Sequence, residues 1–292
     1  MTPEMFKTLL SRFCGPATTV TVPCTSTPRL SVKTLGQAVS HTGECYTAQI
    51  KLFPEQIDLL KTTFSRLFIA GPPGTGKSVV LLLMGIEWLR CGHHVYIVSS
   101  WKRSRAASIM LYHLLLQTVK TQQSAGVSPG QPHLLQYDFN DTKEVEKAVT
   151  DLSQEARERE LFVLSDEAVH EYRSGFHNFC NKLLTHVPCL HLWMASCYHG
   201  DAPADWKVEY LTRPLRSPPA VLREVRKSRN ITKDGNVCEY SQRDVPDHTD
   251  GPPVKQLYHR GEGHSSSWLG DCVTCGREIA IFLHSLRAPG SS

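Results

Sequence analysis

Residues 71–78 read G-P-P-G-T-G-K-S, and this segment constrains the fold more than any other part of the chain. It follows a short apolar run at residues 67–70 and leads into an apolar stretch with helical character from Lys77. Glycines between a strand and a helix let consecutive backbone N–H groups point inward, and the helix N-terminus favours negative charge. The sequence therefore predicts a phosphate-binding loop, or P-loop, between a buried strand and a helix.

Two loop side chains have specific expected roles in binding ATP. Lys77 should reach the β- and γ-phosphates, and the Ser78 hydroxyl should ligate Mg²⁺. The other expected nucleotide contacts come from Gly71, Pro72, Pro73, Gly74, Thr75 and Gly76. The alternative is a chance glycine-rich turn with a solvated lysine, which the flanking strand and helix disfavour.

A pair of acids follows a second apolar run, at residues 161–164. Asp166 is expected to bind Mg²⁺, directly or through water, because a carboxylate at the end of a neighbouring strand commonly completes a P-loop site. Glu167 is the candidate general base that orients and deprotonates the attacking water. Adjacent acids are also common on surfaces, and the position after a core strand favours the catalytic interpretation.

Short apolar runs alternate with amphipathic stretches from residue 52 onward, which predicts an α/β fold with a parallel sheet flanked by helices. The expected strands are residues 67–70, 95–98, 134–137, 161–164 and 190–194. The expected helices are residues 77–90, 104–120, 141–158 and 170–186.

The chain divides by composition into four predicted parts. Residues 1–46 are rich in Thr, Ser and Pro and are expected to form an accessory or weakly structured lead-in. Residues 47–226 hold the P-loop domain, and residues 227–253 read as a polar linker. Residues 254–292 contain one more strand and helix pattern, which predicts a partial second domain.

Charge and hydrophobicity exclude few classes of protein. A net charge of +4 is compatible with a nucleic-acid partner but does not require one. The longest wholly apolar run, residues 79–84, is far shorter than the roughly 20 residues of a membrane span. With no apparent secretory signal, we expect an intracellular protein of the cytoplasm or nucleus, without a membrane partner.

Ten cysteines are spread at irregular intervals, which favours free thiols in a chain of 292 residues. The only C-x-x-C pair is Cys272 and Cys275. A lone pair without a matching second half is weak evidence for a metal. Scattered histidines, including His264, do not complete a recognisable ligand pattern, so no structural metal is expected.

With these motifs, residues 50–220 resemble the first RecA-like domain of superfamily one helicases. The resemblance implies a RecA-like P-loop fold. It also implies that Gln56, in the segment L-F-P-E-Q, reads the adenine edge through its amide. Arg216 matches the arginine of the fourth motif and would act as an arginine finger on the γ-phosphate. The alternatives are a surface glutamine at a helix start and a surface arginine in a basic loop.

The segment after residue 98 is placed like the motif that contacts single-stranded nucleic acid in that family. Trp101 would stack a base, while Lys102, Arg103 and Arg105 would meet phosphates. A solvated basic helix start is the alternative. The chain departs from the family at residues 196–201, where Gly-Asp is present but the glutamine of the third motif is missing.

The favoured function is an ATP-binding, helicase-like P-loop NTPase that hydrolyses ATP in connection with single-stranded DNA or RNA. An ATP-dependent switch or scaffold with little turnover is the alternative, favoured by the missing third motif and the partial second domain. A P-loop kinase is a third possibility. Against it stand the acid pair Asp166 and Glu167, typical of water activation, and the lack of an arginine-rich lid.

Overall fold

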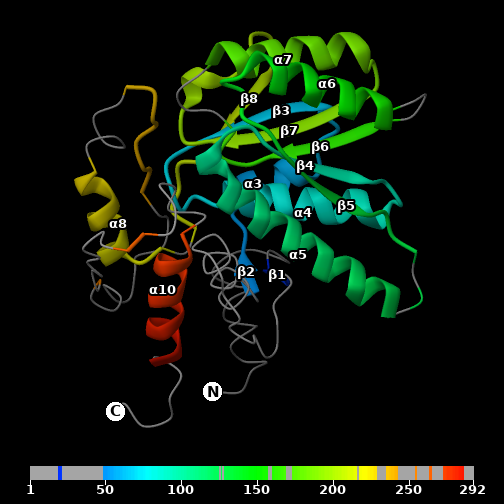
Figure 1. Ribbon diagram of the computed structural model, residues 1–292. Helices are drawn as coiled ribbons and strands as arrows, with labels where there is room; N and C mark the ends of the chain where they lie inside the picture. Colours follow the sequence, from blue (N-terminus) through cyan, green and yellow to red (C-terminus); the bar gives the residue numbers. More distant parts are fainter. Residues whose placement is uncertain are drawn as a thin grey trace.

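The computed structural model describes residues 19–21, 49–124, 126, 128–156, 160–168, 173–215, 217–228, 235–242, 254, 263–264 and 272–285. Within them, one sheet has the strand order β5-β4-β6-β7-β3-β8, and every pair in it is parallel (Figure 1). Its strands are β3 (Arg66–Ala70), β4 (Val95–Ser99), β5 (Pro132–Gln136), β6 (Leu161–Ser165), β7 (Leu190–Ser196) and β8 (Lys207–Tyr210). A separate antiparallel pair joins β1 (Thr19–Thr21) to β2 (Gln49–Lys51).

Helices cover both faces of the sheet. Those described are α3 (Pro54–Leu60), α4 (Lys77–Arg90), α5 (Arg105–Ser124), α6 (Thr142–Glu155), α7 (Arg173–His186), α8 (Pro219–Lys227) and α10 (Val273–Ser285), with short 3₁₀ turns η1 (Lys102–Ser104) and η2 (His199–Asp201). Figure 1 shows α3, α4 and α5 on one face and α6 and α7 on the other. The predicted α/β fold with a parallel sheet flanked by helices is confirmed.

Successive side chains along the central strands point to opposite faces of the sheet, so a hydrophobic core lies on each face. Leu67 and Ile69 of β3 pack under α4 and α5, whereas Phe68 and Ala70 point to the face covered by α6 and α7. All four side chains are fully buried. A strand buried on both faces reads as a continuous apolar run, which is why β3 was recognisable in the sequence. Truncating one such leucine to alanine typically costs about 2–5 kcal/mol.

Local signals set the ends of several helices as predicted. The helix expected at residues 77–90 has these bounds as α4, and Gly92 follows it with a φ of 86°. The Asp141 side chain accepts a hydrogen bond from the Lys143 N–H at 2.8 Å and caps α6. A cap of this kind is worth about 1 kcal/mol. The other helices and strands expected from residue 67 to residue 194 are present within a few residues of their predicted bounds.

Strand β8 was not predicted. Its sequence, Lys-Val-Glu-Tyr, alternates charged and apolar residues and lacks a continuous apolar run. It lies at the edge of the sheet beside β3, where its side chains are partly exposed. An edge strand tolerates this composition because solvent covers one side of it.

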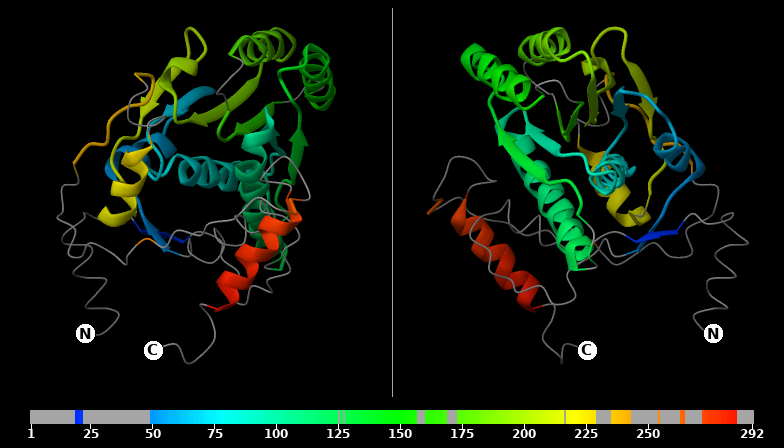
Figure 2. Two further views of the ribbon diagram at one scale, coloured as in Figure 1. Left: turned by 60° about the vertical axis from the view of Figure 1, so that its left-hand side comes forward. Right: turned by 90° about the vertical axis from the view of Figure 1, so that its right-hand side faces the viewer.

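The predicted lead-in and linker fall largely outside the described residues, and the four predicted parts remain a prediction. Helix α10, from the predicted second domain, lies outside the two helical layers of the sheet (Figure 2). Among the described helices, none is both long and apolar enough to cross a membrane.

Candidate nucleotide site

The candidate site lies where β3, β7 and β6 end side by side. The chain leaves β3 into the 71–76 loop and leaves β6 directly into Asp166 and Glu167. Strand β7 separates these two strands in the sheet. Because all three strands are parallel, their carboxyl ends meet at one edge, where open α/β sheets bind ligands. The two sequence motifs are thus brought together although roughly ninety residues separate them.

The loop backbone follows a path that requires glycine at its closest contacts. Gly71 passes so near Leu211 that an added Cβ would lie 1.9 Å from the Leu211 carbonyl oxygen. Gly76, the residue before α4, has a φ of 92°, and a Cβ there would lie 2.6 Å from Gln56 Nε2. Any larger residue would displace the loop or its supports, so these two positions fix the turn into α4.

Lys77 is a buried cation at the start of α4, only 5% exposed. Its Nζ donates hydrogen bonds to the carbonyl oxygens of Gly71 at 2.7 Å and Pro72 at 3.1 Å. The Thr75 hydroxyl donates to the same Pro72 oxygen at 2.9 Å. The ammonium group is therefore folded against its own loop, where the carbonyl dipoles compensate part of the loss of hydration.

Asp166 is completely buried. Its Oδ1 accepts a hydrogen bond from the Glu167 N–H at 3.0 Å, whereas Oδ2 has no hydrogen-bond partner. Burial raises the pKa of this carboxyl, and the Ser78 hydroxyl and the Lys77 cation oppose that rise. Ser78 is thus close enough to affect the charge on Asp166 without completing a hydrogen bond to Oδ2.

Glu167 adopts a φ of 50°, a left-handed conformation that is unfavourable for a residue with a side chain. Two contacts hold it there. The Trp101 indole N–H donates to the Glu167 carbonyl at 2.7 Å, and the Ala168 N–H donates to the Ala195 carbonyl at 3.0 Å. Burial and the neighbouring Asp166 charge raise the pKa of Glu167, and Lys77 opposes the rise.

Cys197 directly follows β7 and lies between Lys77 and Glu167. Its Sγ is 3.7 Å from Lys77 Nζ and 3.9 Å from Glu167 Oε2. Burial raises the pKa of this thiol to about 11, although Lys77 works in the opposite direction. In the sequence, this placement is indicated only by the position of Cys197 after an apolar run.

The donor set fits a magnesium ion. Mg²⁺ prefers oxygen ligands, needs only one or two protein groups and retains several waters. Asp166 offers a buried carboxylate oxygen without a partner, and Ser78 offers a hydroxyl beside it. A cation there would also reduce the electrostatic repulsion between the Asp166 and Glu167 carboxylates.

Gln56, the predicted adenine reader, is hydrogen-bonded within the protein at both ends of its amide. It is 1% exposed, and its Nε2 donates to the Thr75 carbonyl at 2.8 Å. Its Oε1 accepts from the Phe53 N–H at 3.0 Å. Gln56 thus connects α3 to the 71–76 loop, and contact with adenine stays a prediction. Arg216, the predicted arginine finger, lies outside the described residues.

The basic segment after β4 is only partly available for the expected nucleic-acid contacts. Trp101 is half-buried, and the Arg103 guanidinium lies 5.6 Å from its ring centroid. Arg103 is exposed, whereas Lys102 and Arg105 are partly buried. The indole N–H bond to Glu167 connects this segment to the candidate base, a contact that the sequence could not indicate.

A segment from the predicted linker, residues 235–242, contacts the 71–76 loop. The Tyr240 hydroxyl donates to the Pro73 carbonyl at 2.7 Å, and the Arg226 guanidinium lies 5.4 Å from the Tyr240 ring centroid. Val237 forms an isolated antiparallel bridge with Tyr198. Burial raises the pKa of Tyr240 to about 12. Sequence analysis missed this contact because the segment is polar and has no periodic pattern.

Comparison with known proteins adds no further assignment, since neither a protein-family model nor a curated protein matches this chain.

Proposed function

We propose that this chain is a helicase-like P-loop NTPase that binds Mg·ATP at the carboxyl ends of β3 and β6 and hydrolyses it. The observation that carries the proposal is the cluster of the buried Lys77 and Asp166 with the partly buried Glu167. Removing a cation and an acid from water is costly, and acids with perturbed pKa values gather at functional sites. The glycine-containing 71–76 loop beside these three residues would hold the phosphates.

The residues present divide the reaction between them. On binding, Lys77 Nζ would leave the loop carbonyls and donate to the β- and γ-phosphates of ATP. Asp166 and Ser78 would hold Mg²⁺, which supplies charge neutralisation on the same phosphates. Glu167 would accept a proton from water while the water oxygen bonds to the γ-phosphorus and the bond to the ADP oxygen breaks. The products are ADP, phosphate and the released proton.

The test of nucleotide binding is Lys77→Ala, with Lys120→Ala as the matched control. Lys120 is an exposed lysine of α5, away from the loop in sequence. We expect Mg·ATP affinity or turnover to be abolished in the first variant and retained in the second, measured with a fluorescent ATP analogue and by phosphate release. Matching far-UV circular dichroism spectra ensure that both proteins are folded. Unchanged nucleotide binding and turnover in folded Lys77→Ala would refute the proposal.

The proposed nucleic-acid connection rests on Trp101, which contacts Glu167 from the basic segment. Single-stranded DNA or RNA bound at Arg103 would act on the candidate base through this indole. We expect single strands to raise ATP turnover and Arg103→Ala to reduce that stimulation without changing basal turnover. Phosphate release with and without each polymer measures both. Equal stimulation in Arg103→Ala would remove this segment from the interface.

One observation favours the second candidate, an ATP-dependent switch with little turnover. Tyr240 is hydrogen-bonded to the P-loop at Pro73, so residues 235–242 are in place to respond when the loop binds phosphate. Nucleotide binding without turnover, accompanied by changed protease sensitivity of this segment, would favour the switch. Rapid turnover stimulated by single strands would favour the motor.

A further inference from the structure

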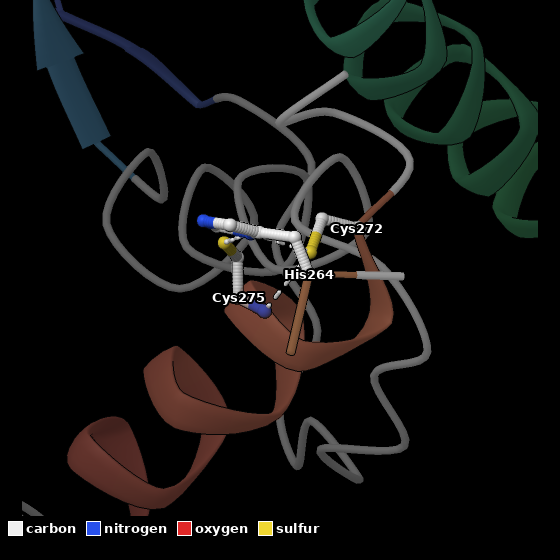
Figure 3. A group of neighbouring side chains, drawn as sticks. All are labelled: His264, Cys272 and Cys275. Carbon is white, nitrogen blue, oxygen red and sulfur yellow. Dashed lines mark hydrogen bonds between the residues drawn. The ribbon is translucent and has the colours of Figure 1, made fainter. Parts of the chain in front are cut away.

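Three potential metal ligands meet at the start of α10 (Figure 3). The thiols of Cys272 and Cys275 and the imidazole of His264 have ligand atoms that all lie within 4.8 Å of one another. His264 Nδ1 is 3.2 Å from Cys272 Sγ and 3.4 Å from Cys275 Sγ. Both cysteines are buried, and His264 is exposed. The C-x-x-C pair, read in the sequence as lacking a partner, therefore has a histidine beside it.

The two N···S distances approach the corresponding edge of a zinc tetrahedron. With Zn–S near 2.3 Å and Zn–N near 2.0–2.1 Å, a tetrahedral N···S edge is about 3.5–3.6 Å. The two observed N···S distances fall short of that edge by less than about half an ångström. All three atoms would lie at bonding distance from one ion after a side-chain adjustment that also sets the two sulfurs, which lie within 4.8 Å of each other, at their tetrahedral edge of about 3.8 Å.

The backbone around the cysteines also suits a metal-bound thiolate. Cys272 immediately precedes α10, and Cys275 lies in its first turn. The Cys275 N–H donates to Cys272 Sγ at 3.5 Å. Backbone N–H groups and the positive end of a helix both stabilise the charge of a thiolate. A single Nδ1 lone pair accepts only one thiol proton, whereas a cation engages all three ligand atoms at once.

We propose that His264, Cys272 and Cys275 bind one zinc ion. Among the common divalent metals, zinc is the one that typically combines thiolate and imidazole ligands. Water or a further side chain would complete the tetrahedron. The ion would fasten residues 263–264 to the first turn of α10, a cross-link independent of the proposed nucleotide site.

The test is zinc content of the full chain, purified under reducing conditions, loaded with zinc and washed. We expect about one zinc per chain by elemental mass spectrometry, and cobalt in its place should give the absorption bands of a tetrahedral thiolate site. Cys275→Ser and His264→Ala should each weaken zinc binding by about tenfold or more in competition with a chromophoric chelator. Cys189→Ser, which removes an exposed free thiol, is the matched control and should bind zinc normally.

A second variant separates ligation from folding. His264→Cys keeps a zinc ligand at the same position, so it should restore tight binding, which a merely damaged protein would not do. The proposal is overturned if the wild-type chain takes up no zinc, or if Cys272 and Cys275 form a disulfide under the reducing conditions. Zinc retained equally in Cys275→Ser and His264→Ala would also overturn it.

Discussion

Asp166→Asn is expected to stabilise the ligand-free protein while weakening its response to magnesium nucleotide. The wild-type carboxylate is completely buried, and its Oδ2 has no hydrogen-bond partner. Asparagine has nearly the same shape but no charge, so it avoids the desolvation of an ionised group. The substitution therefore removes a strain that the site retains for its ligand.

The size of the effect follows from the lost charge, because the asparagine amide would still place a polar atom at the position of Oδ2. A buried polar group without a partner costs about 1–3 kcal/mol, and more when it is charged. We therefore expect the free energy of unfolding to rise by about 1–3 kcal/mol in the presence of a metal chelator. For a domain of about 150–250 residues, each kcal/mol corresponds to about 2–4 °C in Tm. The ligand-free variant should then melt at least about 2 °C above wild type.

Asp166→Asn should also be stabilised less than the wild-type protein by bound nucleotide. At a hundredfold excess over Kd, Mg·ADP should stabilise the wild-type protein by about 2.7 kcal/mol, whereas Asp166→Asn should gain clearly less. Thermal or urea denaturation with chelator and then with Mg·ADP measures both values. Asp58→Asn, at an exposed position, is the control and should differ from wild type by less than about 0.5 kcal/mol.

The pH dependence gives the sign independently. The pKa of Asp166 is raised above its usual 3.8, so the folded state holds this proton more tightly than the unfolded state. Protonated Asp166 contributes fully to folding stability below pH 3.8, and this contribution is lost as pH rises through the raised pKa. The advantage of Asp166→Asn should therefore grow with pH across that window. A chelator-treated variant less stable than wild type at neutral pH would refute the reasoning.

Three further predictions concern turnover and access to the site. Glu167→Gln should leave Mg·ATP binding largely intact while cutting phosphate release by about 10²-fold or more; collapse of binding would instead make Glu167 a ligand or a structural residue. Because the pKa of Glu167 is raised, turnover in a pH series should begin to fall, as pH drops, above the usual value of 4.5, and an acid limb at or below 4.5 would contradict this. Tyr240→Phe should raise nucleotide affinity by about fivefold if the hydrogen bond from Tyr240 to Pro73 must break when nucleotide binds, because such a bond is worth about 1 kcal/mol. An unchanged affinity in a nucleotide titration would show that residues 235–242 do not restrict access to the 71–76 loop.

The parts predictable from sequence were those encoded by neighbouring residues. The loop at residues 71–78 and the acids after β6 stand out because each follows a continuous apolar run, as a strand buried on both faces must. Helix α4 was predictable at both ends because a glycine precedes it and Gly92 follows it. These are local rules of backbone conformation, and they do not depend on the rest of the fold.

The parts that escaped prediction depend on contacts between distant segments. Strand β8 is recognisable only once β3 is known to lie beside it. Tyr240 and Cys197 reach the site from a polar segment and a strand end, and no periodicity marks them. His264 meets the cysteine pair across seven intervening residues that carry no ligand pattern. Tertiary pairing of this kind leaves little trace in a single sequence.

The position of β7 makes it a spacer between the two halves of the site. Ala195 pairs in register with Ile69 of β3, the strand before the 71–76 loop, and its carbonyl accepts a hydrogen bond from the N–H of Ala168, next to the acids. Adjacent strands lie about 4.8 Å apart, so two strand widths, about 10 Å, separate the loop strand from the acid strand. Ala195 is fully buried and touches no substrate in the proposed reaction. The separation between the 71–76 loop and the two acids is thus set by the backbone pairing of β7 with a strand on each side. A bulkier side chain at Ala195 would press on the core beneath the site without changing any residue of the proposed reaction.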